Sequence, residues 1–267
     1  MRSMRPVSRR HAAAAAVGTG ALAAFAALAA FAAEPVAAGA ATPSAQTQYR
    51  ASLNAVGSQG VHFSSVATQS GVTIHVEGDT GSTSGSQSLT VKKGSLSEHL
   101  GALVVGTTGY VKGDKAALHN VLGLSNALAG KYSGAWLSFP TSNSALGQLV
   151  GGLLNSEITT ELQMSGPFTY GAVTTVNGQQ ARAIHGFVST QSGSKVPVVL
   201  YIPPSGAPLP IQEVTNPGGA GGSSAIHGTV TFSHWGETTN VKAPGKSVSL
   251  LKLVPSATSG ATSTTGG

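Results

Sequence analysis

Val72-Thr73-Ile74-His75-Val76-Glu77 is the stretch of sequence that decides the fold. Apolar and polar residues alternate along it, which places its two valines and its isoleucine on one face of an extended chain. This period of two is typical of a strand with one buried face. Turn-forming residues separate it from similar segments on both sides, so we expect an antiparallel meander. The expected strands are 61–66, 72–77, 87–93, 97–105 and 109–112.

The middle of the chain changes to helical spacing. Asp114 is suited to cap a helix whose apolar stripe ends before Gly123, and a second short helix is expected from Ser125 to Tyr132. A brief helix is also expected near the start of the domain, over 46–56. The longest amphipathic pattern has apolar residues three and four positions apart, as on one helix face. These residues are Leu146, Leu149, Val150, Leu153, Leu154, Ile158 and Leu162.

Strand patterns return after Gly166-Pro167. Asn177-Gly178 separates two alternating segments and predicts a two-residue hairpin turn between strands 172–176 and 180–188. Further strands are expected at 196–202, 211–214 and 226–232. Two groups of strands around a helical middle predict an α+β domain, in which one curved antiparallel β-sheet packs over a few short helices.

The N-terminus has the pattern of an export signal. Four arginines precede an apolar stretch over 12–33, and Ala38-Gly39-Ala40 follows as a small-residue cleavage site. We expect cleavage after Ala40 and a protein that works outside the cytoplasm. The apolar stretch is also long enough to remain as an uncleaved signal anchor in the cytoplasmic membrane. The expected organisation is a signal at 1–40, a linker at 41–45, one domain at 46–254 and a disordered tail at 255–267.

Composition narrows the function classes. The chain has no cysteine, so neither a disulfide framework nor a lipidated cysteine is possible. Charged residues make up 9% of the chain, against roughly 25% in an average globular protein. Beyond the signal these charges are scattered, with Lys92-Lys93 as the one adjacent basic pair. Nucleic-acid binding is therefore not expected.

The sequence has no spacing pattern typical of a catalytic or metal site. The seven histidines after the signal form no HExxH or HxH spacing, and no GxSxG elbow occurs. His75, His185 and His227 are able to converge across strands, but His75 is expected on the polar face of its own strand. Glu157 and Glu161 are expected on a solvated helix face rather than as an acid/base pair. The sequence thus predicts no enzyme, no metal site and no cofactor.

The segment Val230-Thr231-Phe232-Ser233-His234-Trp235-Gly236-Glu237, continuing to Pro244, resembles the closing strands of LppX/LprG-type envelope lipoproteins, whose fold is LolA-like. Gly109-Tyr110-Val111-Lys112-Gly113 resembles the turn before the first inner helix of that family. The segment from Ile202-Pro203 to Pro210-Ile211 resembles its hairpin with a proline-containing bend. The resemblance spans 46–254, but the lipidated cysteine at the mature N-terminus of the family is missing here.

The resemblance implies a half-barrel sheet over helices that encloses an apolar cavity for acyl chains. Burial of each methylene group contributes roughly 0.8 kcal/mol, so such a site needs apolar volume and little catalytic chemistry. The cavity would be lined by Val72, Ile74, Val76, Leu89, Val91, Leu118, Leu122, Leu146, Leu149, Val150, Leu153, Leu154 and Ile184. The same residues also fit an ordinary packed core, and the sequence pattern does not separate these two arrangements.

Two functions therefore remain open. The first is an exported non-enzymatic carrier or sensor that binds the acyl chains of a lipid or lipoglycan, as a monomer that can meet a membrane surface. The alternative is a cell-envelope protein with a solid core that binds another protein, and an exported hydrolase is a third, weaker hypothesis. A cavity of several hundred Å³ would favour the carrier. A filled interior with an exposed apolar patch would favour the partner-binding protein.

Overall fold

The computed structural model describes residues 42–57, 59–189, 193–218 and 227–253. The expected export signal (1–40) and the expected tail (255–267) lie outside these residues. The helices are α1 (Ala45–Val56), α2 (Lys115–Asn120), α3 (Asn126–Tyr132), α4 (Ser144–Gly147) and α5 (Asn155–Glu161), with a 3-10 turn, η3, at Leu250–Lys252. The strands are β1 (His62–Gln69), β2 (Val72–Asp79), β3 (Ser84–Lys93), β4 (Leu96–Val105), β5 (Thr108–Gly113), β6 (Leu137–Pro140), β7 (Ser165–Val176), β8 (Gln179–Ser189), β9 (Lys195–Ile202), β10 (Gln212–Thr215), β11 (His227–Ser233) and β12 (Val248–Ser249).

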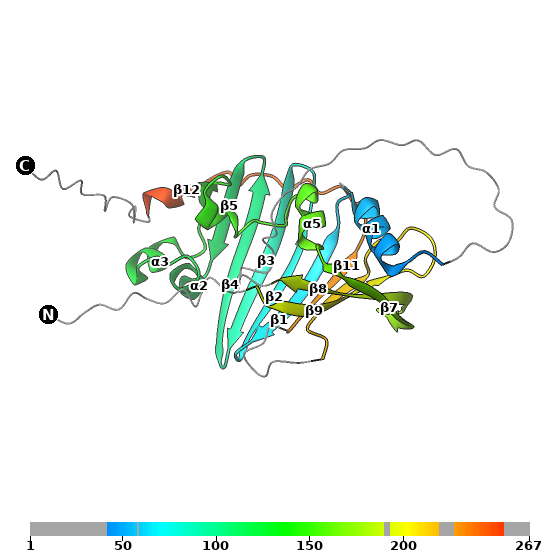
Figure 1. Cartoon of the computed structure of the whole chain (residues 1–267). Helices are drawn as coiled ribbons and strands as arrows, with labels where there is room; N and C mark the ends of the chain where they lie inside the picture. The colour runs from blue at the N-terminus through cyan, green and yellow to red at the C-terminus, as the bar shows by residue number, and fades with distance from the viewer. Residues whose placement is uncertain (1–41, 58, 190–192, 219–226, 254–267) are drawn as a thin grey trace, which may run out of the picture.

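In the described residues, twelve strands form one sheet in the order β12-β6-β5-β4-β3-β2-β1-β11-β10-β9-β8-β7. Neighbouring strands are antiparallel except β12 and β6, which are parallel. The pairing of β1 with β11 joins the two groups of strands that the helical middle separates in the sequence. The sheet curves, so that β7, β8 and β9 pass in front of β1 and β2 in Figure 1. The predicted fold class, a curved antiparallel sheet with a few short helices, is confirmed.

Local sequence explains the turns and caps of these elements. Asn177 and Gly178 both have positive φ (50° and 78°), which a two-residue hairpin turn between β7 and β8 requires. Asp114 caps α2 through its Oδ1, which accepts a hydrogen bond of 2.7 Å from the Ala117 amide. Its Oδ2 accepts a second bond, of 2.8 Å, from the His99 amide of β4. The capping residue therefore also fixes α2 against the sheet.

The expected long helix over 146–162 is wrong. The structure has α4 and α5 instead, joined by an irregular segment that contains Gly151 and Gly152. Gly152 has a φ of +78°, a left-handed conformation that ends a helix. The backbone beside it pairs with Gly81, since the Gly81 amide donates to the Leu153 carbonyl and the Asn155 amide donates to the Gly81 carbonyl. Contact with the sheet has replaced helical hydrogen bonds there.

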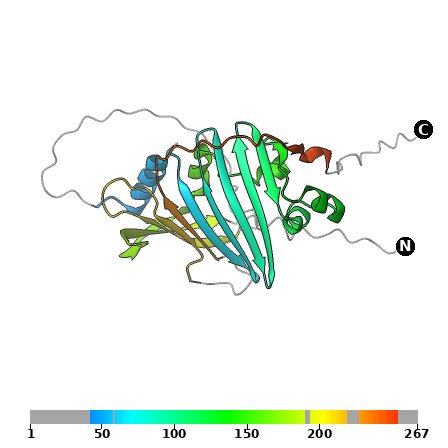
Figure 2. The same cartoon turned by 180° about the vertical axis from the view of Figure 1, so that it is seen from behind.

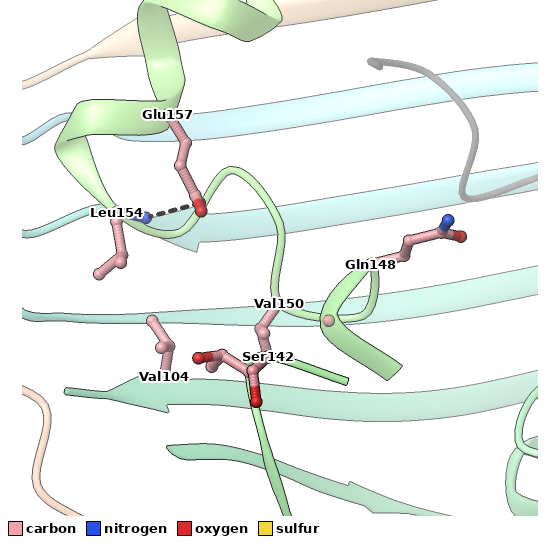
Figure 3. A pocket seen from close by; sticks show the side chains of 8 residues that line it. Val104, Ser142, Gln148, Val150, Leu154 and Glu157 are labelled. Atoms are coloured by element: carbon pink, nitrogen blue, oxygen red, sulfur yellow. Dashed lines mark hydrogen bonds between the residues drawn. The ribbon is translucent and has the colours of Figure 1, made fainter. Parts of the chain in front are cut away.

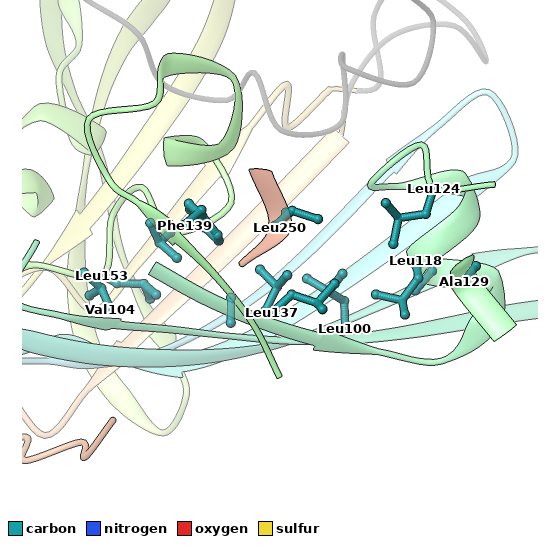
Figure 4. Packing of buried hydrophobic residues seen from close by; sticks show 13 residues of the cluster. Leu100, Val104, Leu118, Leu124, Ala129, Leu137, Phe139, Leu153 and Leu250 are labelled. Carbon is teal, nitrogen blue, oxygen red and sulfur yellow. The ribbon is translucent and has the colours of Figure 1, made fainter. Parts of the chain in front are cut away.

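The helices lie on one face of the sheet, and β1 to β4 show no helix across their opposite face (Figure 2). Buried side chains on the helix-covered face form two clusters. The first cluster lies under α2, α3 and η3 and includes Leu100, Ala102, Val104, Leu118, Leu124, Leu137, Phe139, Leu153 and Leu250 (Figure 4). The second cluster lies under α1 and α5 and includes Tyr49, Val56, Val61, Ile158, Leu162, Ile184, Leu200, Ile202 and Phe232.

Strand β12 was not expected from the sequence. The chain leaves β11 and runs along one end of the sheet to reach β6 at the far edge (Figure 1). The Ser84 hydroxyl accepts a 3.1 Å bond from the Val241 amide on the way, and the Val248 amide donates to the Trp136 carbonyl at 2.9 Å. This returning segment brings Leu250, near the C-terminal end of the described residues, into the first cluster.

Leucine truncation tests which positions belong to the packed core. Leu118 is 0% exposed, so Leu118→Ala is expected to lower the free energy of unfolding by about 3 kcal/mol, through lost burial and a residual cavity. Leu96 is 64% exposed at the β3–β4 turn, so Leu96→Ala, the same chemical change, is expected to cost less than about 0.5 kcal/mol. Urea denaturation of both variants measures the difference, and equal losses would contradict this assignment of the core.

Candidate functional site

Five apolar side chains of β2 and β3 lie side by side on the helix-covered face without being fully buried. Ile74 pairs with Val91 and Val76 pairs with Leu89, so alternation places them on one face, with Val72 at the end of the same row on β2. We call Val72, Ile74, Val76, Leu89 and Val91 the apolar strip. Each of these residues is only partly buried. Leu89 packs against the first cluster, and the other four belong to neither cluster.

The apolar strip crosses the middle of the sheet, between the two covered ends. Cross-strand pairing runs through a continuous row on this face from β4 to β8: Leu100, Leu89, Val76, Ser65, Val230, Glu213, Leu200 and Ile184. Leu100 at one end and Leu200 with Ile184 at the other are buried. The side chains between Leu100 and Glu213 are partly exposed. The structure therefore leaves apolar surface open where the helices leave the sheet uncovered.

A pocket of about 410 Å³ lies on the same face, at one end of β4. Val104 belongs to its wall and alternates with Leu100 and Ala102 along the strand, which fixes the face. Val150 and Leu154 provide the other apolar walls, whereas Ser142 and Gln148 give the pocket a polar rim (Figure 3). The remaining wall residues are Thr141, Gly147 and Glu157. The volume falls within the usual range for small-molecule sites, roughly 300–1,000 Å³.

Glu157 has a structural task in this pocket. Its Oε2 accepts hydrogen bonds from the Gly152 amide at 2.8 Å and from the Leu154 amide at 3.4 Å, the latter drawn in Figure 3. These amides precede α5 and would otherwise lack helical partners. The expectation that Glu157 lies on a solvated face is therefore wrong, since the side chain is half-buried and closes the turn that shapes the pocket.

The residues that the sequence proposes for a cavity lining separate into three groups. The strand residues Val72, Ile74, Val76, Leu89 and Val91 form the apolar strip. Val150 and Leu154 line the pocket. Leu118, Leu153 and Ile184 are fully buried within the clusters, and Leu122, Leu146 and Leu149 pack partly buried against the first cluster. The structure thus divides these residues among a strip, a separately lined pocket, and positions in or against the packed core.

One charged residue on this face was missed by sequence analysis. Glu213 of β10 is 8% exposed and lies between Val230 and Leu200 in the cross-strand row. Its Oε2 has no hydrogen-bond partner among the described residues. Burial raises the pKa of Glu213 to about 7. The signal in the sequence was a lone acidic residue inside a segment expected to be a strand, on the same face as apolar neighbours of other strands.

A second carboxyl with a raised pKa lies on α5. Desolvation by surrounding protein raises the pKa of Glu161 to about 7, and repulsion from Glu157 and Glu213 adds to the effect. The Glu161 side chain is nevertheless exposed to water. Water weakens such a shift at Glu161, whereas Glu213 is buried and keeps it.

The histidines give no metal centre in the part of the chain that the structure describes. His75 and His185 are both exposed, on β2 and β8, and His227 Nδ1 lies 3.2 Å from the Asn216 carbonyl. His62 Nδ1 lies 2.7 Å from Asp79 Oδ1, which ties β1 to β2. Within the same described residues, no helix is long and apolar enough to cross a membrane.

Comparison with solved structures finds the same type of fold. LprF from Mycobacterium bovis matches with 15% sequence identity and a TM-score of 0.48, covering 75% of this chain and 96% of that chain. The lipoprotein LppX from Mycobacterium tuberculosis matches with 18% identity and a TM-score of 0.46, over 74% of this chain and 98% of that chain. LppX is thus among the matches and belongs to the family that the sequence resembles.

A more distant match is a putative outer membrane lipoprotein-sorting protein domain from Vibrio parahaemolyticus, with 8% identity, 74% and 95% coverage and a TM-score of 0.26. No protein-family model matches the sequence, and comparison with curated proteins gives no match. At TM-scores below 0.5 and identities below 20%, these resemblances say nothing about a ligand of this chain. The apolar strip, the pocket and Glu213 are what bear on function.

The raised pKa of Glu213 predicts a pH dependence of stability. A glutamate in an unfolded chain titrates near pH ~4.3, so between ~4.3 and about 7 the folded protein holds a proton that the unfolded chain releases. This contribution to stability is fully present below pH ~4.3 and is lost as pH rises through about 7. The free energy of unfolding is therefore expected to fall with rising pH across this window.

Between pH 5 and pH 8, the fall in the free energy of unfolding is expected to be about 1–3 kcal/mol smaller for Glu213→Gln than for the wild type. Glu77→Gln makes the same change at an exposed position on the opposite face and is expected to keep the wild-type slope. Urea denaturation at several pH values measures both. A wild-type slope in the Glu213 variant would show that the carboxyl titrates normally in the folded protein.

Proposed function

We propose that this protein is an exported, non-enzymatic carrier or sensor that binds the acyl chains of a lipid or lipoglycan. The ligand lies on the helix-covered face of the sheet, on the apolar strip and in the pocket at one end of β4. The observation that carries the proposal is the strip itself, where five apolar side chains of β2 and β3 remain partly exposed between two fully packed clusters.

The chemistry of the strip suits an acyl chain. Its residues offer apolar contacts and no hydrogen-bonding side chain, so a bound group gains by leaving water, at roughly 0.8 kcal/mol per methylene. Neighbouring strands are spaced by about 4.7–4.9 Å, so the row from Leu100 to Val230, apolar except for Ser65, forms a long track rather than a compact pocket. A linear hydrocarbon matches that shape better than a compact metabolite does.

The packed clusters favour a second candidate, the solid-core envelope protein that binds another protein. Leu118, Leu153 and Ile184 are 0% exposed, and these side chains pack as core in this structure. In this alternative, the partner would cover the apolar strip and replace the lipid. The two functions differ in what the strip binds, and a lipid-binding assay separates them.

The wider setting of the proposal comes from the sequence. The arginine-rich and alanine-rich N-terminus supports export and a place in the cell envelope or outside the cell, with cleavage after Ala40 or retention as an anchor. We propose that the domain acts as a monomer that receives its ligand at or near a membrane surface, without a cofactor and without nucleic acid. The scattered charges of the mature chain agree with this setting.

A charge placed on the apolar strip tests the proposal. Val76→Glu is expected to weaken the binding of a fluorescent fatty-acid probe by at least about tenfold, because the carboxylate must be desolvated under the hydrocarbon. Val76 belongs to neither packed cluster, so the variant is expected to fold. The readout is probe fluorescence titrated with the purified protein.

His75→Glu is the matched control, because His75 is the exposed neighbour on the opposite face of β2. This variant is expected to bind the probe as the wild type does. Equal affinity of the Val76 and His75 variants would remove the strip from the ligand site. A wild-type protein that does not bind the probe would contradict the carrier and favour the protein-binding alternative.

A further inference from the structure

We propose that Glu213 is the polar anchor of this ligand site, and that the ligand therefore carries a hydrogen-bond donor, an amine or a hydroxyl, beside its acyl chain. The inference rests on the proposed function, because it names the headgroup chemistry that accompanies the acyl chain. It concerns a residue of β10 that the fold itself does not require to be acidic.

The first support is the position of Glu213 in an otherwise almost entirely apolar row. Its cross-strand neighbours are Val230 of β11 and Leu200 of β9, and the side chain is 8% exposed. An apolar residue would pack at such a position without leaving a polar atom unpaired. Because Oε2 finds no partner in the described parts of the chain, the carboxyl has an acceptor position to offer to a bound molecule.

The second support is the relation of Glu213 to the apolar strip. From Leu89 the row passes through Val76, Ser65 and Val230 before it reaches Glu213. These intermediate side chains are partly exposed, whereas Leu200 beyond Glu213 is fully buried. Glu213 therefore stands where the open surface ends. An acyl chain lying along this row, over four strand spacings or roughly 19 Å of sheet, would bring its polar end to the carboxyl.

The third support is the charge around the site. Glu161 of α5 and Tyr49 of α1 are the titratable groups that the Glu213 charge influences, and Glu157 acts on Glu161 as well. The Tyr49 hydroxyl is already engaged, since it donates to the Leu162 carbonyl at 3.1 Å and accepts from the Met164 amide at 2.6 Å.

Other charged residues on this face include Arg182 of β8, Lys93 of β3, which pairs with Val72, and Glu98 of β4, which pairs with Val91. The guanidinium of Arg182 on β8 lies over the Tyr170 ring, 5.1 Å from its centroid. The charges that help to raise the pKa of Glu161 are the carboxylates of Glu157 and Glu213. Ionised carboxylates here attract a protonated amine and repel a phosphate, a sulfate or a carboxylate. Their oxygens also accept a hydrogen bond from a hydroxyl.

The test compares three single-chain probes that share a hydrocarbon tail and differ in their head: dodecylamine, 1-dodecanol and dodecanoic acid. Binding is measured at pH 8 by displacement of a fluorescent lipid probe from the wild type, Glu213→Gln and Glu77→Gln. The wild type is expected to bind the amine most tightly and the acid least tightly. Glu213→Gln is expected to lose about tenfold to a hundredfold in amine affinity and little in alcohol affinity.

Controls keep the result interpretable. Glu77→Gln, which removes a carboxylate from the opposite face, is expected to leave all three affinities unchanged. Circular dichroism of each variant establishes that it is folded, and Glu213→Leu provides a second, uncharged variant of similar size. Both Glu213 variants are expected to lose the preference for the amine.

The outcomes separate the two levels of the proposal. If the wild type binds all three probes equally, or binds the acid best, the role of Glu213 is overturned while the carrier function stands. The same holds if the Glu213 variants keep the wild-type preference. If the wild type binds none of the probes, the carrier function itself is contradicted.

Discussion

The pairing of β1 with β11 is the contact on which the rest of the structure depends. It joins the first meander to the strands that follow the helices, so that side chains more than a hundred residues apart share one face. Register matters because side chains alternate between faces, and a shift by one residue would move every apolar residue of β11 to the opposite face. The row that includes Val76, Val230 and Glu213 exists only in this register.

Helix placement then decides which part of that face remains open. The helices α2 and α3 pack on one end of the sheet and α1 and α5 on the other, each over a buried cluster. The short segment between α4 and α5 is held to Gly81 and shaped by Glu157, so it does not extend as a helix across the middle. The uncovered strip is thus a consequence of where the helices end, and the proposed function depends on that geometry.

Much of the fold follows from local sequence, but which apolar side chains of the site are buried and which remain exposed does not. Alternation located β2 and β3, Asn177-Gly178 located the β7–β8 hairpin, and Asp114 located the start of α2, because each depends on neighbours along the chain. The packing of Leu118 as solid core and the exposure of Val76 depend on which distant segments cover them. The apolar pattern in the sequence therefore could not show that Leu118 is buried and Val76 is partly exposed.

The burial of Glu213, a charged residue, could not be predicted from local sequence either. Its segment was expected to be a strand, yet its burial depends on tertiary packing that includes the pairing of β10 with β9 and β11. The break in the long amphipathic pattern has a similar origin. Its glycines indicated a helix of low stability. The backbone pairing with Gly81 that replaces this helix could not be inferred from the spacing of the apolar residues.

The central claim is that the open face of this sheet holds an acyl chain. Native mass spectrometry of the protein purified from the secreted or envelope fraction of a bacterial host, followed by organic extraction of the bound material, tests it most directly. We expect a species heavier than the polypeptide by one lipid mass, and an extracted molecule with an acyl chain. A polypeptide that carries no lipid and takes up none from added vesicles would contradict the claim.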